Sequence, residues 1–451
     1  MELIAAVLLA AALLLAPNPA QAQSPDLGSE INRQVRAAKS ASSEMGVHVV
    51  ALDEAEEVYA YRADAMRILA SNTKLMTSAA ALDHLGPGFF FETPVMVRGE
   101  VVDGVLKGDL GVIGGGDPNI SGRHHNGESF APFREWAEAL RRFGGIRRIS
   151  GEIVLATGLF DDQLVHPTWP KDQLDRWYEA PVAALSFNDN CALVKVEPVG
   201  GAGGGPRLSL LPEVPFMRLS GSVTRTARSR DQRLRIGRNA LAADAATRRT
   251  IEVSGRLWRG RTQVDTFISV DDPVAYFGAA LRQALAESGI EVEGRVVTEK
   301  RLVGAAWRPV TVHRSDLLTT LEVVNKRSQN FFAESVLKLL GARYCGRGTW
   351  PAGASVVSDF LRGIGLDDAA FEVADGSGMS RDNRATPRQI TSLLRHMFYH
   401  RWGGEFVRTL PFSGEADLRW EKRLAEGPYR GNVLAKTGSL RGVSTLSGYA
   451  K

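Results

Sequence analysis

The stretch Ala70-Ser71-Asn72-Thr73-Lys74-Leu75-Met76 organises the interpretation of the whole chain. It precedes an Ala- and Leu-rich run that ends at Gly86-Pro87-Gly88, so it predicts the opening turn of a helix. Ser71 and Lys74 are three residues apart, which puts their side chains on one helical face with about 5–6 Å between Cβ atoms. A desolvated lysine can activate a serine hydroxyl, and the N–H groups of a first helical turn lack intrahelical partners. The pattern suits an acylating serine, although S-x-x-K also arises by chance on surface helices.

Composition places the chain among large globular proteins. Its 451 residues are 44% hydrophobic, which is enough for two or three domains. A formal net charge of +4 gives no nucleic-acid footprint, so we expect no nucleic-acid partner. The two cysteines, Cys191 and Cys345, could form one disulfide in an oxidising compartment or remain two free buried thiols.

The N-terminus has the features of a secretory signal. An apolar run from Leu3 to Ala16 is too short to span a bilayer comfortably, and Ala20-Gln21-Ala22 fits a small-residue cleavage site. No Lys or Arg precedes the run, and Glu2 is acidic, which departs from the usual signal pattern. No later segment has 18 consecutive apolar residues. We therefore expect residues 1–22 to be removed and the exported protein to have no integral membrane span.

The middle of the chain changes texture. Residues 191–310 alternate predicted strands with Gly-rich turns, and eleven arginines fall between Arg225 and Arg261. Such a cluster can contact an acidic polymer, or it can line the solvated faces of strands. From His313 the pattern becomes helical again, with Ser315 predicted as the N-cap of a helix over 316–324.

Two later segments carry further polar groups in defined contexts. Ser328-Gln329-Asn330 places a hydroxyl and an amide at a predicted helix start. Lys436-Thr437-Gly438 ends a predicted strand, with residues 443–449 as its antiparallel partner. Each segment is common by itself. The order S-x-x-K, S-x-N, K-T-G in helix, turn and strand contexts matches the motif set of penicillin-binding proteins and serine β-lactamases.

With these motifs the chain resembles the low-molecular-mass class C penicillin-binding proteins, the D-alanyl-D-alanine carboxypeptidase/endopeptidases of peptidase family S13. The similarity covers nearly the whole mature chain, because further segments look like family segments in family order: 115–118 (GGDP), 178–181 (YEAP), 184–190 (ALSFNDN), 328–334 (SQNFFAE) and 375–381 (DGSGMSR). Ser71 and Ser328 are 257 positions apart. A compact serine β-lactamase has no room there for extra domains, whereas this family inserts two.

The resemblance implies an α+β fold in which a penicillin-binding, β-lactamase-like domain is interrupted by two mainly β domains. The implied domains are residues 23–88 with 311–451 for the peptidase, 89–116 with 184–310 for the second domain, and 117–183 for a nested third. The family's peptidase domain continues with another strand and a helix. We therefore expect a sequence that ends at Lys451 to be truncated at its C-terminus.

The resemblance also implies a mechanism. Ser71 would form an acyl-enzyme, Lys74 would accept its proton, helped by burial and by the charge of Lys436, and Ser328 would relay a proton to the leaving amine. The implied substrate-binding residues are Asn330, Lys436, Thr437, Gly438 and Ser439, and the oxyanion hole would use the N–H groups of Ser71 and Ser439. Asp172 or Gln173 would meet the stem-peptide side chain.

The implied partners are peptidoglycan peptides and, as covalent inhibitors, β-lactams. The implied location is the periplasm, with peripheral contact to the membrane left open. The resemblance implies no cofactor and no metal.

Three alternatives stay open. A serine β-lactamase shares the acylation machinery but needs fast deacylation, and Glu334, four residues after Asn330, is not obviously placed for that. A non-catalytic peptidoglycan-binding scaffold is a second alternative, which the intact Ser71 and Lys74 disfavour. A metallohydrolase is a third, because His396 and His400 are spaced i,i+4 on a predicted helix, but H-E-x-x-H and a clear third ligand are missing from the sequence.

Overall fold

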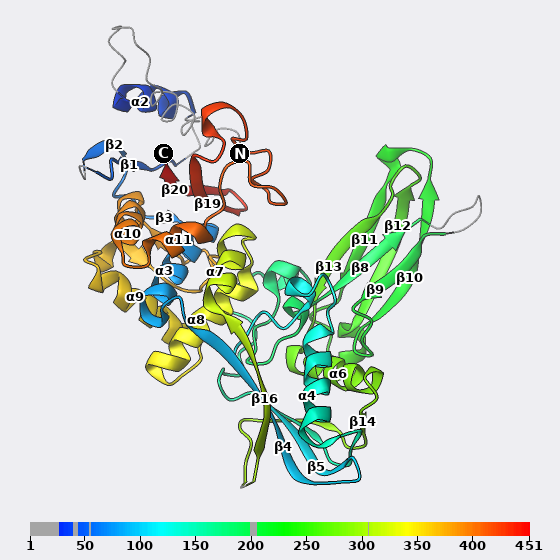
Figure 1. The fold of residues 1–451 in the computed structure, drawn as a ribbon. Coiled ribbons are helices and arrows are strands. Elements are labelled where there is room, and N and C mark those ends of the chain that lie inside the picture. Colours follow the sequence, from blue (N-terminus) through cyan, green and yellow to red (C-terminus); the bar gives the residue numbers. More distant parts are fainter. Residues whose placement is uncertain (1–26, 39–43, 54–55, 199–204, 305) are drawn as a thin grey trace. The chain divides into compact units, whose positions relative to one another are not determined.

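The computed structural model describes residues 27–38, 44–53, 56–198, 205–304 and 306–451. The chain divides into two compact units, one made of the described residues up to Phe89 with Asp316–Lys451, the other of Phe90–Ser315 (Figure 1). The predicted signal peptide, residues 1–22, lies outside the described residues. The further division of the insert at residues 117–183 stays a prediction. Within the described ranges, no helix has both the length and the apolarity needed to cross a bilayer.

The first unit has two fully buried helices at its centre. Ten successive residues of α3 (Thr73–Leu85) are buried, and so are the first twelve of α8 (Asn330–Cys345). A helix buried on all sides must be surrounded by other elements. Further helices of this unit pack against this pair: α7 (Leu317–Lys326), α9 (Trp350–Gly363) and α11 (Gly403–Thr409).

Short antiparallel pairs of strands complete the first unit. β1 (Val47–Val50) pairs with β2 (Glu57–Tyr61), and β19 (Val433–Leu440) pairs with β20 (Val443–Ala450). The second pair confirms the antiparallel partner predicted at residues 443–449. Helix α10 (Pro387–Tyr399) contacts β1 and β20, and the Tyr449 hydroxyl of β20 donates to the Leu394 carbonyl at 2.7 Å. The remaining elements are α2 (Leu27–Ala38) and the small sheet β17–β18–β3 (Phe371–Glu372, Arg384–Ala385, Arg67–Ile68).

The second unit is mainly β-structure. A seven-stranded mixed sheet contains β4 (Phe90–Val102), β5 (Val105–Ile113), β6 (Arg148–Ile149), β7 (Ile153–Ala156), β14 (Glu291–Val292), β15 (Val296–Glu299) and β16 (Arg308–Asp316). Helices α4 (Ala131–Gly144) and α6 (Pro273–Glu287) contact each other, and their buried side chains join the sheet in one hydrophobic core. Two three-stranded sheets follow: β13–β8–β9 (Val264–Ser269, Cys191–Glu197, Arg207–Leu211) and β10–β12–β11 (Arg218–Thr226, Thr250–Trp258, Arg233–Arg238). Together the two units form a mixed α+β protein.

Two local predictions are wrong. The N-cap of α7 is Asp316, whose carboxylate accepts from the Thr319 N–H at 2.7 Å, while the Ser315 hydroxyl donates to Asp117 at 2.6 Å. Adjacent residues of an extended chain point to opposite sides, so only one of the two can face the helix start.

The two cysteines are both free, as one alternative expected, but only Cys191 is buried. Cys345 is exposed at the last position of α8.

Candidate active site

Ser71 lies where a strained turn enters the central helix. A 3₁₀ turn, η1 (Ala70–Asn72), runs directly into α3. Ala70 has a φ of +47°, a left-handed conformation that non-glycine residues adopt only when the surroundings enforce it. The enforcing contacts involve the Leu69 carbonyl, which accepts from the Asn72 N–H at 3.1 Å and from the Thr445 hydroxyl of β20 at 2.9 Å. The turn therefore holds Ser71 in one backbone conformation.

Lys74 is fully buried one helical turn after Ser71. Its ammonium donates to Ser71 Oγ at 3.1 Å, to Asn330 Oδ1 at 2.7 Å and to the Ser377 carbonyl at 2.7 Å. Burial lowers the pKa of Lys74 to about 7, against the opposing effect of the carboxylates of Glu334 and Asp375. A lysine with this pKa is about half neutral at pH 7, which suits it to accept a proton from the hydroxyl it contacts.

The S-x-N segment approaches from the start of α8. Ser328 has a φ of +55° and lies before the helix, which begins at Asn330 with Gln329 as its N-cap residue. This turn directs Ser328 Oγ to the ammonium of Lys436, which donates to it at 2.8 Å, while Asn330 contacts Lys74. The three-residue motif thus links the two lysines.

Lys436 is the second buried cation of the site. It lies on β19, is 1% exposed, and donates to Ser328 Oγ and to the Thr437 carbonyl at 2.7 Å. Burial holds the pKa of Lys436 well below its usual range, and the charges of Lys74 and Arg419 lower it further. The nearby carboxylates of Glu334 and Asp375 act in the opposite direction on Lys74 and favour its protonated form.

Gly438 brings β19 against Ser71. A Cβ atom at this position would lie 2.9 Å from the Ser71 nitrogen and 2.8 Å from the Leu69 carbonyl oxygen, closer than side chains pack. Thr437 is half-buried and Ser439 is exposed on the same strand, opposite Leu446 and Ser444 of β20. Direct contacts therefore join Lys74 to Ser71 and Asn330, and Lys436 to Ser328. Thr437, Gly438 and Ser439 follow Lys436 on the same strand.

Glu334 is a site residue whose role the sequence did not reveal. It is fully buried on α8, and its carboxylate accepts from Trp350 Nε1 at 2.8 Å, the Gly376 N–H at 2.9 Å and the Ser377 N–H at 2.8 Å. Burial and the neighbouring charge of Asp375 raise the pKa of Glu334 to about 7. These bonds fix the backbone whose Ser377 carbonyl accepts from Lys74. The signals in the sequence were the i,i+4 spacing from Asn330 and the glycines that flank Ser377.

Asp375 holds the same loop from its other side. Its carboxylate accepts from the Gly378 N–H at 2.7 Å, the Ser380 N–H at 2.6 Å and Asn383 Nδ2 at 2.8 Å. Gly378 has a φ of +85°, and a Cβ atom there would lie 1.8 Å from the Ala70 carbonyl oxygen. The loop over 375–383 thus packs directly on the turn that carries Ser71.

Asp172 and Gln173 belong to the second unit. They lie in the 3₁₀ turn η3 (Lys171–Gln173), where Gln173 Oε1 accepts from the Tyr178 hydroxyl at 3.0 Å. Nearby Glu179 is buried, and its pKa is raised to about 8 by burial and by the charges of Asp172 and Asp175. The proposed contact of Asp172 or Gln173 with substrate stays a prediction.

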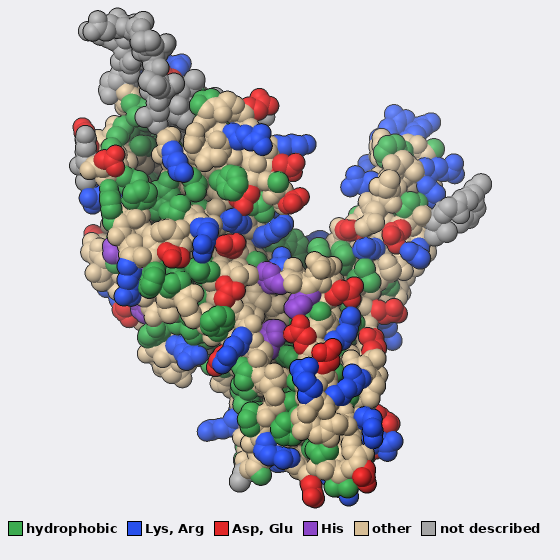
Figure 2. Space-filling view, viewed as in Figure 1, with side chains coloured by type: hydrophobic (Ala, Val, Ile, Leu, Met, Phe, Trp, Pro, Cys, Tyr) green, Lys and Arg blue, Asp and Glu red, His purple; other side chains and the backbone are tan. Residues whose placement is uncertain are grey.

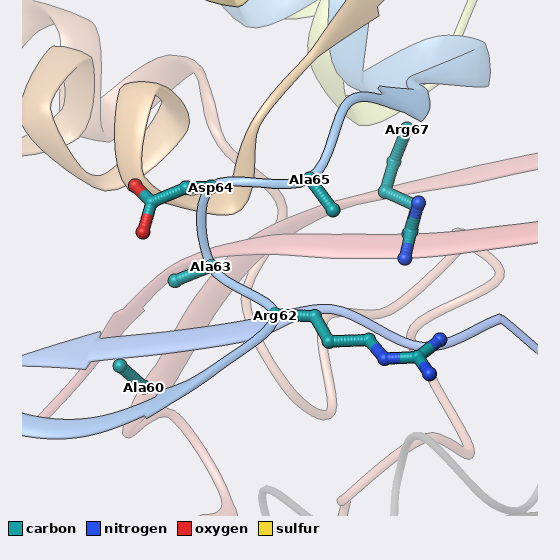
Figure 3. A pocket seen from close by; sticks show the side chains of 6 residues that line it. All are labelled: Ala60, Arg62, Ala63, Asp64, Ala65 and Arg67. Carbon is teal, nitrogen blue, oxygen red and sulfur yellow. The ribbon is translucent and has the colours of Figure 1, made fainter.

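A separate pocket of about 590 Å³ opens between β2 and β3 and is lined by Ala60, Arg62, Ala63, Asp64, Ala65 and Arg67 (Figure 3). In Figure 3 the side chains of Arg62 and Arg67 extend to the same side of the loop, and Asp64 points away from them. Asp64 pairs instead with Arg388 at 2.7 Å. The pocket contains none of the motif residues and no nucleophile, so it is not a candidate site for acyl transfer.

The histidine pair of the metallohydrolase alternative is engaged in other contacts. The rings of His396 and His400 lie 5.6 Å apart, and His400 Nε2 lies 3.1 Å from an oxygen of Asp83. His400 follows the last residue of α10, so the two histidines do not share a helix as expected. In the part of the chain that the structure describes, no group of three or more His, Cys, Asp or Glu residues is arranged to bind a metal ion.

Comparison with known proteins gives a consistent result. The model of the D-Ala-D-Ala carboxypeptidase 3 (S13) family matches residues 29–451. A D-alanyl-D-alanine carboxypeptidase of Actinomadura sp. strain R39 is 33% identical over 428 residues, which covers 90% of this chain and 74% of that protein. The crystal structure of penicillin-binding protein 4 from Haemophilus influenzae is similar with a TM-score of 0.77 at 25% identity, covering 91% of this chain and 88% of that one. The same protein complexed with a β-lactam matches with a TM-score of 0.72.

Proposed function

This chain belongs to the D-Ala-D-Ala carboxypeptidase 3 (S13) family, and we propose that Ser71 is the residue it acylates in hydrolysing the bond between two D-alanines. The chain is a serine-type D-Ala-D-Ala carboxypeptidase, as its family and its relatives indicate. The observation that carries the assignment of Ser71 is its contact with Lys74, a buried lysine with a pKa of about 7.

In the proposed acylation, Ser71 Oγ attacks the carbonyl carbon of the penultimate D-alanine. Lys74 takes the hydroxyl proton as the new C–O bond forms, because it lies 3.1 Å away and is partly neutral at pH 7. The N–H groups of Ser71 and Ser439 stabilise the negative charge that develops on the carbonyl oxygen. Gly438 makes this arrangement possible, since only a residue without Cβ lets β19 approach the Ser71 nitrogen this closely.

The leaving D-alanine needs a proton on its amine and a partner for its carboxylate. Ser328 is placed to pass a proton to the amine, since its hydroxyl contacts Lys436. Lys436 and Thr437 bind the carboxylate, and the approach of that anion restores the charge that burial disfavours on Lys436. Asn330 holds the substrate's backbone amide group while its Oδ1 fixes Lys74. The proton that Lys74 took from Ser71 goes to the leaving amine through the Ser328 hydroxyl, so Lys74 is neutral again. Water then attacks the acyl-enzyme carbonyl, Lys74 takes a proton from that water, and Ser71 Oγ receives this proton as its bond to the acyl group breaks.

The proposed partners are peptidoglycan stem peptides, cross-linked peptides cut by an additional endopeptidase activity, and β-lactams that acylate Ser71.

The contacts of Glu334 favour slow deacylation, as in a peptidase, over the fast deacylation that a β-lactamase needs. Its two oxygens already accept from three donors, so it is not a free base for a deacylating water.

The proposed location is the periplasm after removal of residues 1–22, and the insert at 117–183 is proposed as a nested domain.

Two assays test this function. Incubation with purified muropeptides should release D-alanine from pentapeptides, and cut cross-links would establish the endopeptidase activity. Incubation with penicillin should give a long-lived covalent adduct. Rapid multiple turnover of penicillin would instead support the β-lactamase, and full D-alanine release by Ser71→Ala would support a site elsewhere.

A further inference from the structure

The sheet β10–β12–β11 carries a positive charge that the rest of the molecule lacks. Residues 218–261 contain twelve arginines, no lysine and three acidic residues, an excess of nine positive charges. Because the whole chain has a formal net charge of only +4, all other residues together are net negative by five. The positive charge of this protein is therefore concentrated in one tenth of its length.

The strand register places like charges opposite one another. In the antiparallel pair β11–β12, Arg233 lies directly opposite Arg256, and Arg235 lies opposite Ser254 on the same solvated face. The other face of these strands is apolar, with Leu234 and Ile236 half-buried and Val253 and Leu257 buried. Directly opposed like charges destabilise a sheet. Folding alone gives no reason for an arginine pair at this position.

More arginines surround the same end of the sheet. Arg228 and Arg230 lie in the connection from β10 to β11, and Arg259 and Arg261 follow the last residue of β12. We call the set at this end the arginine tip: Arg225, Arg228, Arg230, Arg233, Arg235, Arg256, Arg259 and Arg261. Figure 2 shows Lys and Arg side chains gathered over this end, which Figure 1 draws as the outer end of β10, β11 and β12 within their unit.

The arginine tip has no acidic partners among the described residues. None of its eight guanidinium groups lies within ion-pair distance of a described carboxylate, and all but Arg225 are exposed. At the opposite end of the same sheet, Arg248 and Arg249 both pair with Asp271, at 3.2 and 3.1 Å. Residues 199–204, which lie outside the described residues, contain no acidic residue in the sequence, so they cannot supply the missing charge.

We propose that the arginine tip is a docking surface for an anionic phospholipid bilayer. Guanidinium groups pair with phosphate in a bidentate manner, and several arginines near an anionic bilayer add their attraction. The tip is one end of a sheet and consists of strand ends and short connections (Figure 1). Several of its side chains can therefore lie against a flat surface at the same time. A single polymer chain is instead bound along a groove, whereas the pocket at β2 and β3 and a second pocket lined by residues of β4, α4 and β16 lie on other elements.

Attachment at the tip is electrostatic and superficial. The tip's aromatic residue, Trp258, is only half-exposed and its Nε1 donates to the Ala227 carbonyl at 3.2 Å, so it is held by the protein. None of the exposed large hydrophobic side chains of the described chain lies between Arg225 and Arg238 or between Arg256 and Arg261. Without an apolar anchor, binding should weaken as salt screens the charges.

The experiment compares vesicle binding by three forms of the full chain. The tip variant replaces four arginines that lie outside the strands: Arg228→Gln, Arg230→Gln, Arg259→Gln and Arg261→Gln. The control variant removes the same charge elsewhere: Arg142→Gln, Arg295→Gln, Arg301→Gln and Arg347→Gln. Co-flotation is measured with vesicles of phosphatidylglycerol and phosphatidylcholine, with vesicles of phosphatidylcholine alone, and with soluble polyphosphate as competitor. Residues 1–22 are the same in all three forms, so any binding through their apolar run cancels in the comparison.

We expect wild type to bind anionic vesicles in preference to neutral ones, the tip variant to bind them roughly 100-fold more weakly, and the control variant to resemble wild type. Covalent labelling by penicillin should be equal in all three, which verifies folding independently of vesicle binding. Equal losses in the tip and control variants would reduce the effect to net charge and overturn the proposal. Tip-dependent binding of polyphosphate without binding of anionic vesicles would overturn the assignment to a bilayer.

Discussion

Lys74 and Lys436 in the first unit are 0% and 1% exposed, whereas seven of the eight arginines of the tip in the second unit are exposed. The lysines contact hydroxyl, amide and carbonyl oxygens within 3.1 Å, and burial lowers the pKa of both. The eight arginines have no acidic partners among the described residues. Burial lowers the pKa of a lysine, and a lysine with a lowered pKa can accept and donate a proton near neutral pH. Exposed arginines stay charged, and several of them together attract an anionic partner.

Among the variants considered, Lys74→Ala is expected to have the largest effect, and this effect should be confined to acylation. Removing the proton acceptor should lower the rate of acylation of Ser71 by about 10³-fold. Stopped-flow measurement of β-lactam acylation checks the value, and a thermal melt of the variant verifies that it folds. Vesicle binding should not change. An acylation rate within a few-fold of wild type would remove Lys74 from the mechanism.

A smaller effect is expected for Lys436→Ala, and it depends on the substrate. The variant should lose about 10²-fold in kcat/KM on a peptide with a free terminal carboxylate, because a charge-assisted contact is removed. On the same peptide with an amidated C-terminus, the variant and wild type should differ little. Equal losses on both peptides would mean that Lys436 acts on the reacting groups and not on the carboxylate.

Gly438→Ala tests the close approach of β19. A Cβ atom would lie 2.2 Å from Thr445 Oγ1 and 2.9 Å from the Ser71 nitrogen, so the strand must shift and acylation should fall at least about tenfold. Gly404→Ala is the matched control, because no heavy atom lies within 4 Å of the added Cβ. If both variants acylate like wild type, the N–H groups of this strand do not form the oxyanion hole.

The smallest predicted change is a shift in pH dependence for Glu334→Gln. In the proposed mechanism acylation requires neutral Lys74, so the rate should rise with pH through a midpoint near 7. Glu334 raises the pKa of Lys74, so loss of its charge should move the midpoint to lower pH. Glu372→Gln, which removes an exposed charge on β17, should leave the midpoint in place. An unmoved midpoint in Glu334→Gln would show that the carboxylate only positions the loop.

Much of the site could be predicted because its motifs are local. The Ser71 helix follows from its Ala- and Leu-rich run and from Gly86, and the β19–β20 hairpin follows from two strand patterns joined by a short turn. The roles of Glu334 and Asp375 could not be predicted in this way. Both depend on hydrogen bonds to the backbone of residues 376–380, and Glu334 reaches them from 42 positions earlier in the chain. The left-handed backbone of Ala70 and Ser328 also depends on tertiary contacts, because neither residue type favours that conformation.

The starts of α7 and α10 show why cap prediction failed at Ser315. At α10, Thr386 precedes Pro387, and its hydroxyl accepts from the Gln389 N–H at 3.2 Å. Ser315 had a competitor in the next residue, Asp316, and an acceptor for its own proton in Asp117, which is 198 positions away. Local patterns decide a cap only when no distant partner competes for the same side chain.

The most direct test of the account is identification of the residue that penicillin modifies. The chain is incubated with penicillin, digested and analysed by mass spectrometry, with Ser71→Ala treated in parallel. One acyl adduct is expected on the peptide that contains Ser71, and none on Ser71→Ala. An adduct on another residue, such as Ser328, or an equal adduct on Ser71→Ala, would contradict it.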